Sequence, residues 1–224
     1  MLSFFRYIWS FVLGVKLEEY KSSVSGSLEL WLVNGRKVLN SAHANYSYDS
    51  LHRVFRKTFR ALDLASAPPR EVLVLGFGAG SVASILHKEY AFDCRITGVD
   101  LDPLLFRIAA EHFGIQPSGK LQLHTADALL FMQEDRQLYD LLVVDIFVDA
   151  LVPSAVTAAS FIQNCLDALP PGGRFIMNFI VSDTDSKQKF ENVYTFLRAR
   201  QGELRVLHPL PGNAVVCFRK YETD

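Results

Sequence analysis

Between residues 28 and 33 of this 224-residue chain, Leu28, Leu30 and Leu32 alternate with Glu29, Trp31 and Val33. This period of two is typical of a β-strand with one buried face, and the Asn34-Gly35 pair that follows favours a type I′ turn. Strand and turn together predict a β-hairpin that returns through residues 37–39. The next apolar residues recur at helical spacing, which predicts a helix with one buried face; they are Leu51, Val54, Phe55, Phe59 and Leu62.

The Pro68-Pro69 pair ends this helix and divides the chain into two parts. We expect residues 1–67 to form an extension made of an aromatic helix, a β-hairpin and a helix, and residues 68–224 to form the main domain. The aromatic-rich segment at residues 1–20 is too short to span a membrane. It could pack on the body or on a second subunit, or lie at a membrane surface. We favour packing, with a homodimer formed through this region, since the segment has few cations.

From residue 70 onward, short apolar runs alternate with segments of helical spacing, which predicts a doubly wound parallel sheet. The runs that predict strands lie at residues 72–75, 95–99, 120–125, 139–147 and 174–181. Two further strands are joined by a turn at residues 210–213, so the last strand should be antiparallel. The sequence therefore predicts an α/β fold: a Rossmann-like sheet of seven strands with an antiparallel last strand, plus a small N-terminal β-hairpin and helix extension.

The first strand of the main domain runs into a turn with three glycines, Gly76, Gly78 and Gly80. Glycine has no Cβ and tolerates positive φ, so the backbone can approach a ligand, and the following helix start directs free N–H groups there. The second strand ends in Asp100, where a carboxylate can accept both hydroxyls of a ribose. A purely structural turn is the alternative. The pairing of turn and acid favours a nucleoside ligand above the carboxyl ends of the sheet.

The spacing of the glycines narrows the ligand class. Ser81 follows the third glycine, so the Gly-x-Gly-x-x-Gly pattern of dinucleotide-binding enzymes is incomplete. This disfavours NAD and FAD and favours a site for S-adenosylmethionine, which has no pyrophosphate. The net charge of −1, without a basic block, gives no support for a nucleic-acid partner. Three scattered cysteines in apolar contexts favour the cytoplasm, and no metal-type spacing of cysteine or histidine is present.

The order of these features resembles the class I S-adenosylmethionine-dependent methyltransferase fold and, more narrowly, its spermidine synthase (polyamine aminopropyltransferase) branch. The glycines fall on that family's turn, and Asp100 and Asp102 match its ribose-binding strand end. Asp127, in the sequence Ala-Asp-Ala, matches the acid that contacts the adenine amino group. The resemblance implies S-adenosylmethionine or its decarboxylated form as cofactor, with contacts from Gly76, Phe77, Gly78, Gly80, Asp100, Leu101, Asp127 and Ala128.

The acceptor half of the family's site is only partly kept. Ala79 stands where the family has an acid, and of its Asp-Ser-Ser-Asp-Pro segment only Asp145 matches, with Asp149 shifted by one residue. At the helix entry, only Tyr48 of the family's Tyr-His/Gln-Glu remains. A cationic polyamine needs several carboxylates to offset its desolvation. We therefore expect Tyr48 and Asp149 to bind a substrate other than putrescine.

Asp145 ends the central strand and is the candidate catalytic residue. Apolar surroundings could raise its pKa and make it a base, or its charge could only steady the sulfonium or an acceptor N–H. Asn178, on the fifth strand, could join Asp145 in binding Mg²⁺, but two ligands are too few to predict a metal. Asp102 and Asp127 could instead each cap the helix that follows.

The leading hypothesis is a cytoplasmic, spermidine synthase-like enzyme that uses S-adenosylmethionine to methylate an unknown small molecule. We expect it to have no nucleic-acid partner and no membrane span. Two alternatives stay open: an aminopropyltransferase that uses decarboxylated S-adenosylmethionine, and a non-catalytic nucleoside-binding or assembly protein. A nicotinamide-dependent oxidoreductase is less favoured, because the third glycine of its pattern is missing.

Overall fold

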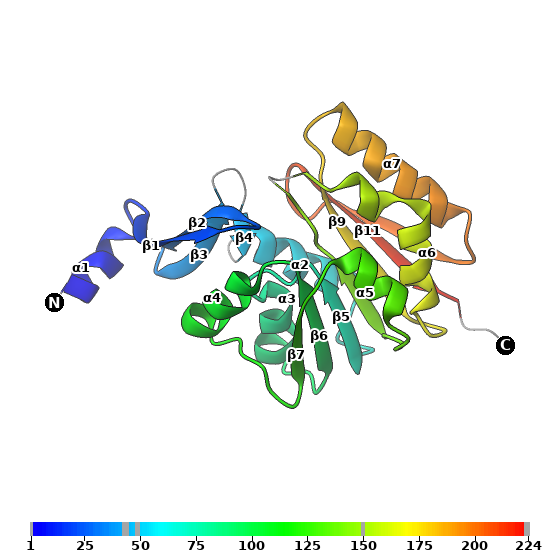
Figure 1. The fold of residues 1–224 in the computed structure, drawn as a ribbon, viewed down its shortest axis with the longest axis horizontal. Helices are drawn as coiled ribbons and strands as arrows, with labels where there is room; N and C mark the ends of the chain where they lie inside the picture. The colour runs from blue at the N-terminus through cyan, green and yellow to red at the C-terminus, as the bar shows by residue number, and fades with distance from the viewer. Residues whose placement is uncertain (1, 42–44, 48–49, 149–150, 222–224) are drawn as a thin grey trace.

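A computed structural model describes residues 2–41, 45–47, 50–148 and 151–221, which form two sheets of unequal size (Figure 1). The larger sheet has the strand order β10-β11-β9-β8-β5-β6-β7. Its strands are β5 (Glu71–Leu75), β6 (Arg95–Asp100), β7 (Leu121–Thr125), β8 (Leu141–Val144), β9 (Arg174–Ile180), β10 (Gly202–Leu207) and β11 (Asn213–Lys220). Strands β5 to β9 are parallel, and β11 is antiparallel to β9 and β10. The predicted seven-stranded sheet with an antiparallel last strand is confirmed.

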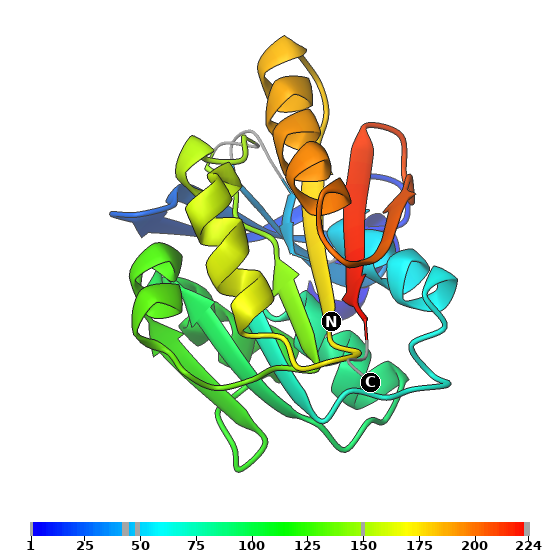
Figure 2. The same cartoon turned by 90° about the vertical axis from the view of Figure 1, so that its right-hand side faces the viewer.

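Helices cover both faces of this sheet (Figures 1 and 2). One face carries α2 (Ser50–Ala61), α3 (Ser81–Ser84) with its π-helical continuation η1 (Ile85–Glu89), and α4 (Pro103–Phe113). The other carries α5 (Ala128–Glu134), the 3₁₀ turn η2 (Ser154–Thr157), α6 (Ala159–Asp167) and α7 (Thr184–Arg198). The apolar positions between residues 154 and 169 are thus divided between a 3₁₀ turn and the α-helix that follows it.

Strand β5 shows why its sequence is an unbroken apolar run. Val72 and Val74 belong to the core under α2, α3 and α4, whereas Leu73 and Leu75 belong to the core under α5, α6 and α7. All four side chains are buried. A parallel strand covered on both faces cannot alternate apolar with polar residues. In the sheet, β5 lies between β8 and β6, so its carboxyl end is flanked by the ends of both strands.

The smaller sheet has the order β1-β2-β3-β4 and belongs to the N-terminal part of the chain. Its strands are β1 (Val15–Ser22), β2 (Gly26–Val33), β3 (Arg36–Ser41) and β4 (Asn45–Ser47). The predicted hairpin is the β2–β3 pair, and Asn34 and Gly35 both have positive φ, 48° and 73°. Strand β1 is an element that the sequence pattern did not predict. Helix α1 (Leu2–Trp9) lies at the far tip of this sheet (Figure 1).

Two side-chain contacts attach β1 to α4. The Ser22 hydroxyl donates to Asp102 Oδ2 at 2.5 Å, and the Tyr20 hydroxyl lies 2.6 Å from His112 Nε2. Asp102 is buried and also accepts the Leu104 N–H, so it is the N-cap of α4, and its second predicted role as a ribose contact stays a prediction. The boundary at residues 67 and 68 stays a prediction. Among the described residues, no helix has the length and apolarity needed to cross a membrane.

Candidate functional site

A cavity of about 520 Å³ opens above the carboxyl ends of β5, β6, β8 and β9. One side is formed by the glycine turn and the ends of β6 and β7, and includes Gly76, Gly78, Asp100, Leu101, Asp127 and Ala128. The other side is formed by the ends of β8 and β9, and includes Asp145, Ile146, Phe147, Val148 and Asn178. A crevice beyond the carboxyl ends of the strands is where open α/β sheets bind ligands.

The glycine turn fits closely against the neighbouring strand end. Gly76 has φ 80°, and a Cβ built on it would lie 2.3 Å from the Asp145 carbonyl oxygen. Its N–H donates to the Val99 carbonyl at 2.9 Å, so the turn stays joined to β6. Any side chain at this position would force the turn away from β8. The glycine therefore brings the donor-side backbone and the Asp145 strand end into contact.

Asp100 is held at the end of β6 by backbone hydrogen bonds. Its Oδ2 accepts the Gly78 N–H at 2.8 Å, and its Oδ1 accepts the Asp102 N–H at 3.1 Å. Burial raises the pKa of this carboxyl to about 6, and these hydrogen bonds act in the opposite direction. The acid is thus preorganised beside the glycine turn, and further donors reaching it from the cavity would stabilise its ionised form.

Asp127 combines capping with exposure to the cavity. Its Oδ1 accepts the N–H groups of Leu129 and Leu130, at 2.7 and 3.4 Å, so it is the N-cap of α5. Both bonds use Oδ1, which leaves Oδ2 available, and the residue lines the cavity. The capping and adenine-binding roles weighed for this residue are therefore compatible.

Two of the predicted cofactor residues lie in the turn but not on the cavity wall. Phe77 is buried and packs edge-on against Phe106, with ring centroids 5.8 Å apart. Gly80 has φ 87°, and its N–H donates to the Phe77 carbonyl at 3.0 Å. Both residues stabilise the conformation of the glycine turn without lining the cavity. Tyr48 and Asp149, the predicted substrate residues, lie outside the described residues.

Asp145 faces the cavity from the end of β8 and is hydrogen-bonded to Asn178 on β9. The Asn178 Nδ2 donates to Asp145 Oδ1 at 3.0 Å, and Asn178 is buried. Burial of the carboxyl group raises the pKa of Asp145 to about 7, the Asn178 bond opposes this rise, and the negative charge of Asp100 adds to it. A carboxyl with such a pKa can exchange a proton near neutral pH.

Sequence reasoning missed two contributors to this cavity. Asn213, the first residue of β11, donates from Nδ2 to Asn178 Oδ1 at 3.2 Å and lines the wall. The β1–β2 turn, residues 24–26, forms part of the rim. The residue pattern of β2 predicts a hairpin. Nothing in the sequence near Asn213 or near residues 24–26 indicates that these segments lie at the carboxyl ends of the larger sheet.

The acceptor side of the cavity is mainly apolar. Ile146, Phe147 and Val148 follow Asp145, and Leu51 and Val54 approach from α2. Among the described lining residues the charged groups are Asp100, Asp127 and Asp145, two of which lie on the glycine-turn side. The described chain contains no cluster of three or more metal-ligating side chains, and Asp145 and Asn178 bond to each other. Such a wall suits an acceptor with one polar group on an apolar body.

Comparison with known proteins supports a transferase of this class. A family described as "Methyltransferase domain" matches residues 72–173. The eEF1A lysine and N-terminal methyltransferase of Bos taurus is 30% identical over 136 residues, covering 56% of this chain and 19% of that protein. The polyamine aminopropyltransferase of Chromobacterium violaceum is 29% identical over 154 residues, covering 68% of this chain and 58% of that protein. The chain thus spans about a fifth of the first relative and somewhat over half of the second.

Two solved structures share the architecture. Human Methyltransferase-like protein 13, in complex with SAH, has a TM-score of 0.63 and 26% identity, covering 79% of this chain and 84% of that one. A probable spermidine synthase from Corynebacterium glutamicum has a TM-score of 0.72 and 21% identity, covering 92% and 81%. The fold inferred from the glycine turn and the antiparallel last strand is confirmed by both. The chain has a Rossmann-like methyltransferase fold and is similar to S-adenosylmethionine-dependent methyltransferases and to polyamine aminopropyltransferases.

Proposed function

We propose that this protein binds S-adenosylmethionine and transfers its methyl group to a small molecule with an apolar body. The observation that carries the proposal is the composition of the described cavity wall. Its donor side has a glycine turn and two carboxylates, while the described part of its acceptor side has one buried carboxyl in an apolar wall. A polyamine acceptor would bring several positive charges into a wall that offers few anions. An acceptor with a single nitrogen or oxygen nucleophile avoids this cost.

The residues present fit an adenosyl group. Asp100 is already oriented by two backbone N–H groups, so its free lone pairs can accept the ribose hydroxyls. The unused Oδ2 of Asp127 can accept the adenine amino group, and Leu101 supplies an apolar contact. Gly76 removes the side chain that would otherwise separate the turn from Asp145. We assign these residues, together with Gly78 and Ala128, to the donor.

Asp145 is the residue that we assign to the chemistry. When bound, S-adenosylmethionine supplies an electrophilic methyl group on a positively charged sulfur. That charge disappears during transfer, so an anion beside it stabilises the ground state more than the transition state. The useful role of Asp145 is therefore on the acceptor, where its carboxylate accepts a proton at an Oδ oxygen. The apolar wall of Ile146 and Phe147 positions the acceptor and excludes water.

Calorimetry on one purified sample tests the choice of donor. We expect binding of S-adenosylmethionine and S-adenosylhomocysteine, weaker binding of methylthioadenosine, which lacks the amino-acid portion, and no binding of NAD. Preferential binding of NAD would revive the oxidoreductase, and absence of any adenosyl binding would remove the proposal.

Aminopropyl transfer is the close alternative, because the Chromobacterium relative carries that name and covers 68% of this chain. Incubation of putrescine with each donor separates the two reactions. We expect no spermidine with decarboxylated S-adenosylmethionine, since Asp145, the one carboxyl among the described residues of the acceptor side, cannot offset a diamine. Spermidine formation would overturn the methyl-transfer proposal. A non-catalytic assembly role would be favoured if Asp145→Asn left both the transfer assays and the cellular phenotype unchanged.

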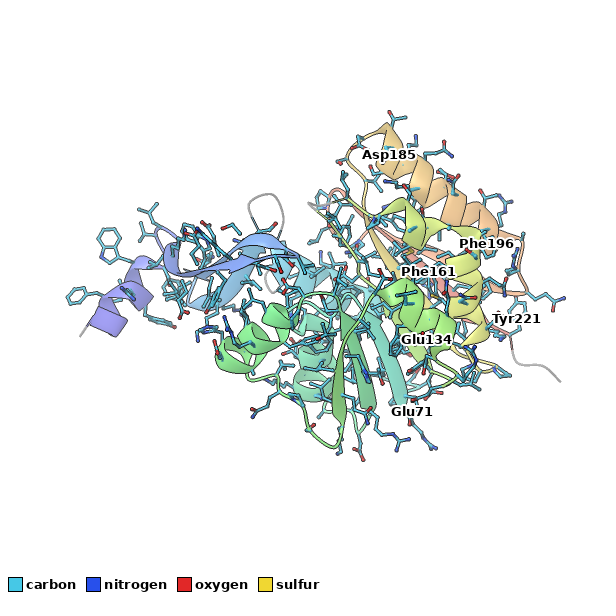
Figure 3. All side chains as sticks on the ribbon, in the orientation of Figure 1. Glu71, Glu134, Phe161, Asp185, Phe196 and Tyr221 are labelled. Carbon is cyan, nitrogen blue, oxygen red and sulfur yellow. The ribbon has the colours of Figure 1, made fainter. Side chains whose placement is uncertain are left out.

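We also propose that the protein is a cytoplasmic homodimer that associates through its N-terminal segment. Figure 3 shows side chains that project outward from the α1 end of the molecule. The apolar side chains at this tip are largely exposed, with Trp9 at 56% and Leu13 at 64%. Contiguous exposed apolar surface favours a partner. Cys94, Cys165 and Cys217 are buried free thiols, as suits a reducing compartment. Light scattering should show that deletion of residues 2–13 halves the molecular mass; an unchanged mass would exclude this interface.

A further inference from the structure

We infer that Asn213 is a positioning residue that locks the amide of Asn178, so that Asn178 always presents an N–H to Asp145. The inference deepens the proposed function, since it rests on Asp145 being the group that accepts a proton. Nothing in the sequence around Asn213 marks it, because it lies in a turn at the start of the last strand. Its role follows from the neighbour that the antiparallel sheet gives it.

Asn213 is held in place by the strand pairing of β11 with β9. Asn213 pairs with Ile180, and Val215 pairs with Asn178, so the two amide side chains come from adjacent strands. The backbone N–H of Asn213 donates to the Leu210 carbonyl at 3.1 Å, which closes the turn before β11. The side chain therefore approaches Asn178 from a backbone that is fixed on both sides.

A series of hydrogen bonds defines which way each amide points. A primary amide has nearly the same shape after a 180° flip, so its orientation is set by its partners alone. Asn213 Nδ2 faces the Phe179 backbone carbonyl at 3.5 Å and Asn178 Oδ1 at 3.2 Å. A backbone carbonyl can only accept, so Asn213 must direct its nitrogen inward. Asn178 must then direct its oxygen to Asn213 and its nitrogen to Asp145, 3.0 Å away.

The chemical consequence falls on the Asp145 carboxyl. An N–H donor stabilises the ionised carboxylate, whereas a flipped amide would place its oxygen there and favour the protonated acid. The other charged groups that line the described cavity are Asp100, at the end of β6, and Asp127, at the start of α5, and both are acids. No described cation lines it. The Asn178 N–H is thus the contact that opposes burial and the charge of Asp100.

Carbon-13 NMR of aspartate-labelled protein measures the titration of Asp145 directly, with Asp145→Asn identifying its signal. We expect Asn213→Ala to raise the titration midpoint by about 0.5 to 1 pH unit, a three- to tenfold change in proton affinity. Asn213→Leu keeps the branched shape and removes the donor, so the same rise is expected if the alanine variant folds poorly. Asn192→Ala is the matched control, because the Asn192 side chain accepts a hydrogen bond from Gln188 on the exposed face of α7, away from the cavity.

The outcomes separate this inference from the proposed function. A midpoint unchanged to within about 0.2 pH unit in both Asn213 variants would overturn the positioning role. Absence of donor binding to the wild-type protein by calorimetry would instead remove the proposed function, and the NMR titration does not need a donor. A higher Asp145 titration midpoint in the Asn213 variants, with an unchanged midpoint in Asn192→Ala, supports the positioning role of Asn213.

Discussion

Asp100 and Asp145 are the two residues whose ionisation governs the site. Burial raises the pKa of Asp100 to about 6 and that of Asp145 to about 7, so both carboxyl groups titrate near the pH at which the protein would work. Perturbed acids in a cleft are the usual mark of a functional site. Asp100 lies beside the glycine turn and Asp145 lies at the end of β8. Because they occupy different parts of the site, their effects on ligand binding can be tested separately.

At Asp145, we expect the preference for S-adenosylmethionine over S-adenosylhomocysteine to rise as pH increases through about 7. The sulfonium is positive and the thioether neutral, so only the former gains from an ionised carboxylate, by about three- to tenfold. Asp145→Asn should make the ratio independent of pH. Calorimetric titrations with both ligands at several pH values measure it, and a pH-dependent ratio in the variant would place the charge elsewhere.

The same two carboxyl groups should make the ligand-free protein less stable as pH rises. Their folded pKa values lie above the ordinary value of 3.8, so the folded state binds more protons between about pH 4 and 7. The free energy of unfolding should therefore fall across that window by on the order of 3–4 kcal/mol per carboxyl. Urea unfolding of wild type and Asp145→Asn tests this. The variant should lose less stability, and equal losses would contradict the assigned pKa.

At the scale of single elements, the β5 turn depends on close approach. Gly76→Ala would place a methyl group 2.3 Å from the Asp145 carbonyl in a backbone with φ 80°. We expect it to cost about 2–4 kcal/mol of stability and at least tenfold in donor affinity. Gly212→Ala is the matched control, with φ 79° and nothing within 4 Å, and should cost only about 1 kcal/mol. Equal costs in thermal unfolding would mean that backbone strain alone matters.

Elements with strong local signals were predictable from the sequence, and those defined by distant partners were not. The Val72–Leu75 run, the glycine turn and Asp100 follow from local pattern, because buried parallel strands are continuously apolar. The Asn34-Gly35 pair predicted the hairpin, because both residue types tolerate the positive φ that a type I′ turn requires and that both have in the structure. Strand β1 was missed because its charged sequence has no clear strand pattern, and its partners, β2 and α4, lie elsewhere in the chain. Asn213 was missed because its partner, Asn178, lies on another strand.

At the scale of the whole molecule, the small sheet and the larger sheet meet at the cavity. The β1–β2 turn forms part of its rim, and Ser22 ties that turn to Asp102, two residues after Asp100. We therefore expect the packing of the N-terminal sheet against the main domain to affect the position of Asp100 on the donor side of the site. This contact belongs to the tertiary structure, and no spacing in the sequence predicts it.

Ser22→Ala should weaken donor binding by at least about two- to tenfold. It removes the bond to Asp102, which contributes about 0.5–1.5 kcal/mol, and also the two bonds that the hydroxyl accepts from the Val24 and Ser25 N–H groups in the rim turn. Ser27→Ala is the matched control, because Ser27 bonds only to exposed Glu19, at 3.3 Å. Calorimetry with S-adenosylhomocysteine compares the two variants. Identical affinities in the two proteins would show that the N-terminal sheet and the donor site are independent.

The central claim is that the cavity binds an adenosyl group whose ribose contacts Asp100. The most direct test is a calorimetric titration of wild type and Asp100→Asn with S-adenosylhomocysteine at pH 7.5. The account predicts saturable binding of one ligand per chain in the wild type and affinity at least about tenfold lower in the variant, because an amide cannot replace the carboxylate that accepts the ribose hydroxyls. No heat in the wild type, or equal affinity in the two proteins, would contradict it.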